Sequence, residues 1–92
     1  MEVERFVFAL QETMSYVRQS KTSNSSSMSV DEIIRRLEAE VKKARDMKPV
    51  DVDLLDRLFA PTGVIQEISI ANGWGTKFLR ISEVVDQFIS GK

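Results

Sequence analysis

The chain has 92 residues, of which 42% are hydrophobic and 29% charged, and its formal net charge at pH 7 is −1. This composition is typical of one small globular domain, and no apolar run approaches the roughly 18 residues that a membrane-spanning helix needs. The absence of cysteine and histidine excludes disulfides, thiolate or imidazole metal sites, cysteine nucleophiles and Ser-His-Asp triads.

The near-neutral charge gives no overall attraction to nucleic acid or to an acidic membrane, which argues against both as partners. The N-terminal segment, residues 1–15, carries glutamates where an export signal would carry lysines, so we expect a cytoplasmic protein. No phosphate-binding loop or nucleophile elbow is present, and no cofactor, metal or small-molecule substrate is indicated. We therefore expect that the protein is not an enzyme.

The first expected element is an amphipathic helix over residues 2–19. Its apolar side chains recur at steps of three and four residues, which is the spacing of one helix face. This face consists of Val3, Phe6, Val7, Leu10, Met14 and Val17. Phe8 falls outside it, which indicates either a second buried side or an aromatic side chain exposed to solvent.

A serine-rich segment follows at residues 20–28. Six of the ten residues from Ser20 to Ser29 are serines, and such side chains bury little apolar surface and compete with the backbone for hydrogen bonds. We expect a flexible connector here.

Ser29 and Glu32 form a capping-box pattern that predicts the start of a second helix, and Met28 is placed for a hydrophobic staple. The helix should end near Met47, because Pro49 disfavours helical geometry in the residue before it. Its apolar face consists of Val30, Ile33, Ile34, Leu37, Val41 and Ala44. Acid-before-base pairs at i,i+4 occur at Asp31–Arg35, Glu32–Arg36 and Glu38–Lys42.

The matching apolar faces of these two helices predict an antiparallel helical hairpin. Each helix would still expose an apolar flank, so a third element must cover them. Residues 51–59 supply one, a short helix capped by Asp51 or Asp53 and ended by Pro61 and Gly63. Its buried side consists of Leu54, Leu55, Leu58 and Phe59.

Two structures compete for residues 64–80. In the helical interpretation Thr62 caps a helix over residues 63–71, and Gly73 takes the left-handed position after its end. In the alternative, a β-hairpin turns at Asn72-Gly73 and the fold is α+β. We favour the helix because Gly75 would weaken the return strand.

The last expected helix is capped by Thr76, and its apolar face consists of Phe78, Ile81, Val84, Val85, Phe88 and Ile89. The predicted fold is a single domain over residues 1–92, a small all-α bundle of about five helices. A long N-terminal hairpin is expected to pack on three shorter C-terminal helices.

Residues 64–82 also have the outline of a helix-turn-helix, with a small residue at Ser69, Gly73 in the turn and an apolar residue at Leu79. A DNA-binding regulator is therefore the alternative function. The recognition helix would carry two cations, Lys77 and Arg80, and also two acids. Two cations are few for the phosphate contacts that DNA binding requires.

The favoured function is a non-catalytic protein–protein interaction module, which presents an aromatic surface to a partner protein or to a second copy in a homodimer. Trp74, the single tryptophan, lies between two glycines and is either a core plug or an anchor for a partner. The candidate contact residues are Trp74, Phe78 and Phe8, as anchors if exposed, with Asn72 and Glu67 as polar neighbours.

Overall fold

The computed structural model describes residues 3–20, 29–60 and 63–90. Over these residues it contains five α-helices and no strand: α1 (Val3–Gln19), α2 (Val30–Arg45), α3 (Val52–Leu58), α4 (Val64–Ala71) and α5 (Gly75–Ser90). The expected all-α bundle is confirmed, and the hairpin alternative at residues 64–80 is wrong. The last helix was expected to be shorter than the first two, but α5 has 16 residues, the same number as α2.

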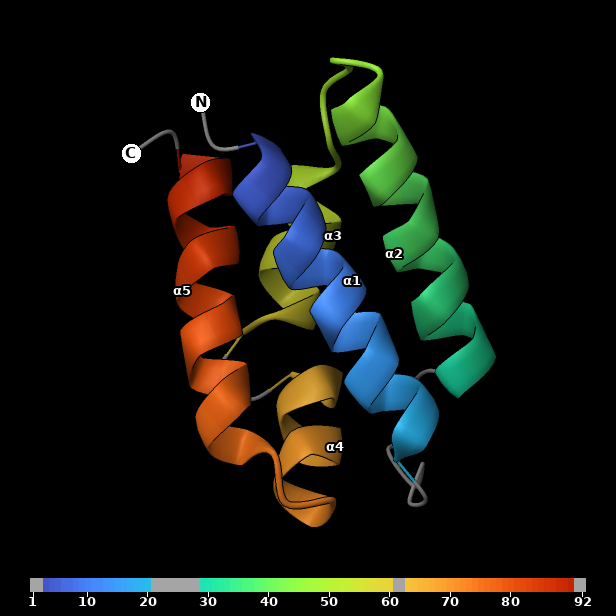
Figure 1. The fold of residues 1–92 in the computed structure, drawn as a ribbon, viewed down its shortest axis with the longest axis vertical. Coiled ribbons are helices and arrows are strands. Elements are labelled where there is room, and N and C mark those ends of the chain that lie inside the picture. The colour runs from blue at the N-terminus through green and yellow to red at the C-terminus, as the bar shows by residue number, and fades with distance from the viewer. Residues whose placement is uncertain (1–2, 21–28, 61–62, 91–92) are drawn as a thin grey trace.

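Helix α1 is the central element of the bundle. It packs against α2 on one side and α5 on the other, and it also contacts α4 (Figure 1). The predicted α1–α2 hairpin is present, while α3 and α4 both pack on α5. Such a central place requires a wide apolar face, and α1 buries Phe6, Val7, Ala9, Leu10, Thr13, Met14 and Val17.

The start of α2 follows the capping pattern in its sequence. The Ser29 hydroxyl accepts a hydrogen bond from the Glu32 amide at 3.1 Å, while the Glu32 carboxylate accepts one from the Arg36 guanidinium at 3.2 Å. The cap and one of the predicted i,i+4 pairs are thus confirmed. Met28, expected in the staple, lies outside the described residues, as does the connector beyond Ser20.

The end of α2 is a Schellman motif. The Lys48 amide donates to the Lys43 carbonyl at 2.8 Å, and the Met47 amide donates to the Ala44 carbonyl at 3.1 Å. Met47 has a positive φ of 59°, in the position where helices usually carry glycine. The last helical residue is Arg45, so the helix ends slightly before the expected Met47.

Asp51 rather than Asp53 caps α3, since its carboxylate accepts a hydrogen bond from the Leu54 amide at 3.1 Å. The N-cap of α4 is Gly63, and Thr62, expected in that role, lies outside the described residues.

The turn between α4 and α5 differs from the expectation in one respect. Gly73 has the predicted positive φ, 83°, and the Trp74 amide donates to the Ser69 carbonyl at 2.8 Å. The Trp74 carbonyl then accepts the first hydrogen bond of α5, from the Phe78 amide at 2.9 Å. Thr76 therefore lies inside the first turn, and its expected role as N-cap is wrong because the helix begins earlier, at Gly75.

Candidate functional site

Trp74 belongs to the core, where 5% of its surface is exposed. Its ring stacks on Tyr16 of α1 with centroids 4.9 Å apart, and its indole N–H donates to the Ser20 hydroxyl at 3.0 Å. The indole therefore fills the space between the end of α1 and the α4–α5 turn, with its one polar atom satisfied. Of the two interpretations of this residue, the core plug is confirmed, and the exposure that an anchor requires is not met.

Phe78 is also a core residue, 1% exposed. It lies parallel to Phe59, with ring centroids 6.1 Å apart and an interplanar angle of 3°. This contact joins α5 to the end of α3, so the side chain is not accessible as an anchor either.

Of the two polar candidates, Asn72 lies beside Trp74 and Glu67 does not. Asn72 is half-buried at the end of α4, where its side-chain amide donates to the Ile68 carbonyl at 2.9 Å. Glu67 lies exposed on the same helix. Asn72 lines a pocket of about 370 Å³ together with Tyr16 and Trp74, but Glu67 and Phe8 are not among its lining residues.

Phe8 is the one candidate anchor that the structure exposes, with 66% of its surface accessible. It stands beside a groove of about 360 Å³ between α1 and α5. Together with Phe8 the groove is lined by Arg5, Ala9, Glu12, Arg80, Ile81 and Val84. We call these seven residues the Phe8 surface. The lining combines four apolar residues with charged residues of both signs.

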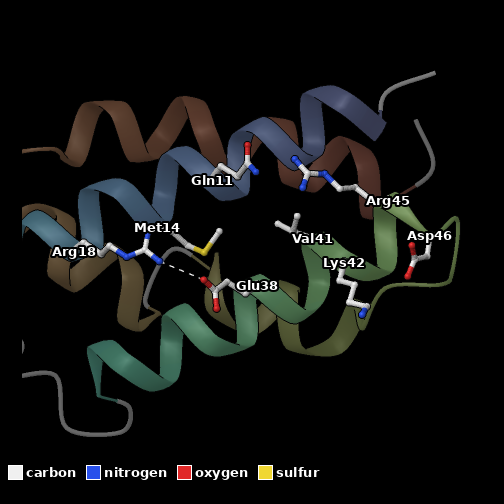
Figure 2. A pocket seen from close by; sticks show the side chains of 8 residues that line it. All are labelled: Gln11, Met14, Arg18, Glu38, Val41, Lys42, Arg45 and Asp46. Atoms are coloured by element: carbon white, nitrogen blue, oxygen red, sulfur yellow. Dashed lines mark hydrogen bonds and ion pairs between the residues drawn. The ribbon is translucent and has the colours of Figure 1, made fainter.

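A larger groove, of about 570 Å³, lies between α1 and α2 (Figure 2). Its apolar members are Met14 and Val41, and Arg18 of α1 forms an ion pair with Glu38 of α2 at 3.3 Å. Gln11, Lys42, Arg45 and Asp46 complete the lining. Cations and carboxylates alternate around this groove, so it does not favour a ligand of one charge.

The i,i+4 spacing predicts that Glu38 pairs with Lys42 on its own helix, but Glu38 forms an ion pair with Arg18 across the groove. The cross-helix pair depends on how α1 and α2 are aligned, which sequence spacing along one helix does not specify.

Glu40 is a buried acid that was not predicted from the sequence. One of its carboxylate oxygens accepts a hydrogen bond from the Asp51 amide at 2.8 Å, and the other accepts one from the Lys43 ammonium at 3.0 Å. The side chain thus joins α2 to the loop before α3, a structural role. Its position three residues after Leu37, inside the apolar face of α2, is the signal that could have identified it.

The helix-turn-helix pattern is matched only in outline. Leu79, the apolar residue of the pattern after the turn, is 58% exposed, and its neighbour Phe78 is buried. The buried residue lies one position before the one in the helix-turn-helix pattern and belongs to the apolar face predicted for the last helix.

Within the described residues, no three acidic side chains gather closely enough to hold a metal ion, and no helix there is long and apolar enough to cross a membrane. Comparison with protein-family models, curated proteins and solved structures finds no significant match to the chain.

Proposed function

We propose that the protein is a non-catalytic protein–protein interaction module whose contact site is the Phe8 surface. The observation that carries this proposal is the exposure of Phe8 beside the groove between α1 and α5. An aromatic side chain that is fully buried in a contact gains about 1.5–3 kcal/mol relative to one left in water. An exposed phenylalanine next to an apolar hollow therefore has the properties of an interface anchor.

The surroundings of Phe8 support the same function. Ala9 and Ile81 form an apolar floor, while Arg5, Glu12 and Arg80 supply charges at the edge of the groove. Interfaces typically place their apolar residues at the centre and their polar residues at the rim, where charges select the partner and its orientation.

Site-specific photo-crosslinking tests the proposal. A photoreactive phenylalanine analogue is placed at position 8 of the full chain, and the protein is irradiated in cells that naturally produce it. We expect adducts of discrete mass. The matched control carries the analogue at Ser15, which is also exposed on α1 but does not line the groove. Equal, diffuse labelling from both positions would overturn the proposal.

A further inference from the structure

We propose that the partner of the Phe8 surface is the same surface of a second copy of this chain, related by a two-fold axis. The inference rests on the proposed function and goes beyond it by naming the occupant of the groove. In this dimer α1 of one copy runs antiparallel to α1 of the other, and each Phe8 enters the groove of its partner.

The first argument is that one patch holds both a projecting side chain and the hollow that could receive it. A two-fold interface uses the same patch on both subunits, so this patch must be complementary to itself. Phe8 projects at the edge of the groove, and the groove floor consists of Ala9 and Ile81, with the half-buried Val84 beside them. A half-turn about an axis through this patch places each projecting ring over the other copy's hollow.

The second argument is the spacing of residues along α1. Arg5, Phe8, Ala9 and Glu12 all line the groove, and they are symmetric about the midpoint between positions 8 and 9. When two antiparallel copies meet at that midpoint, Phe8 of one lies opposite Ala9 of the other. The small alanine side chain leaves space for the aromatic ring.

The same alignment makes the charges complementary. Arg5 and Glu12 lie about 5 Å to either side of the midpoint along the helix axis, given a rise of 1.5 Å per residue. Arg5 of each copy therefore faces Glu12 of the other, so that the dimer contains two opposite-charge contacts. Arg80 adds a cation to the groove, and Glu4, one turn before Phe8 and exposed, adds an acid to the same side of α1.

The contact is small, being centred on two rings, and such interfaces are usually weak and transient. Sedimentation velocity is therefore measured over a wide range of concentrations, from about 10 μM to about 1 mM. We expect the wild-type chain to shift from monomer to dimer within this range. Phe8→Ser should remain monomeric throughout it.

Charge reversal provides the sharpest test. Arg5→Glu and Glu12→Arg should each remain monomeric, because each places like charges opposite one another in the dimer. An equimolar mixture of the two variants restores both opposite-charge contacts, and should associate at least about tenfold more tightly than either variant by itself. Circular dichroism checks that each variant remains helical.

Three results would overturn the proposal: a wild-type chain that stays monomeric to the highest concentration, a dimer that Phe8→Ser leaves intact, or a mixture no tighter than its components. Crosslinking from position 8 to a different protein, with a monomeric wild-type chain, overturns the second copy as partner and leaves the interaction module standing. The absence of discrete crosslinks and of a dimer overturns both.

Discussion

Gly73 is the residue at which backbone conformation most clearly constrains the side chain. Its φ is 83°, and a Cβ added there would meet no atom within 4 Å. The conformation by itself therefore disfavours other residues. We expect Gly73→Ala to lower the free energy of unfolding by about 1 kcal/mol, measured by urea denaturation.

Gly75 is the matched control, because a Cβ there would lie 3.5 Å from Ile70 Cγ1, an ordinary contact, and its φ is not positive. Gly75→Ala should raise stability by about 0.5–1 kcal/mol, since alanine favours the helix and restricts the unfolded chain. Equal effects of the two substitutions on the free energy of unfolding would contradict the left-handed conformation assigned to Gly73.

Met47 is the opposite case, because a residue with a side chain occupies a backbone conformation that favours glycine. Its φ is 59° and 79% of its surface is exposed. The left-handed conformation costs free energy, and the exposed side chain makes few contacts that would offset this cost. Met47→Gly should stabilise the protein by about 0.5–1 kcal/mol in the same denaturation experiment. Met47→Ala keeps the conformational cost and serves as control; a gain equal to that of the glycine variant would refute this explanation.

At the scale of the elements, Trp74 connects the α4–α5 turn to the end of α1 by its stacking on Tyr16 and its hydrogen bond to Ser20. Trp74→Phe keeps an aromatic ring but removes the donor, and Ser20→Ala removes the acceptor. Thermal or urea unfolding of the two single variants and the double variant should give a coupling energy of about 0.5–1.5 kcal/mol. Strict additivity would show that the hydrogen bond does not contribute.

Aromatic side chains from different helices form stacked pairs. Phe6 of α1 stacks on Phe88 of α5 with ring centroids 4.0 Å apart. Phe59, which follows α3, lies parallel to Phe78 of α5 with ring centroids 6.1 Å apart. Helix α5 thus packs against both α1 and α3.

For the molecule as a whole, the two phenylalanines of the predicted site should behave in opposite ways. A domain of this size has a stability of about 5–15 kcal/mol. Phe78→Ala opens a cavity among α3 and α5, and should remove about 3–5 kcal/mol of it. Phe8→Ser changes an exposed position and should shift the unfolding free energy of the monomer by less than about 0.5 kcal/mol.

Denaturation at low protein concentration makes this comparison without a contribution from self-association. If Phe8→Ser destabilises the monomer as much as Phe78→Ala does, Phe8 is a structural residue and the proposed contact surface is lost.

Much of the architecture could be predicted because helix signals are local. The apolar faces at steps of three and four residues, the Ser29 cap and the glycine after α4 each involve residues within one or two turns. The places where prediction failed involve residues far apart in the chain. Glu38 pairs with Arg18, twenty positions away, and Glu40 reaches the loop before α3.

Periodicity and capping depend on neighbouring residues. The amphipathic helices and most of their ends could therefore be predicted without knowledge of the fold. Whether Trp74 and Phe8 lie inside or outside the bundle became clear only from the packing of the helices. Trp74 is buried because α1 brings Tyr16 and Ser20 against the α4–α5 turn, whereas Phe8 lies on the outer side of the same helix. That outcome depends on the alignment of distant helices, which no local pattern encodes.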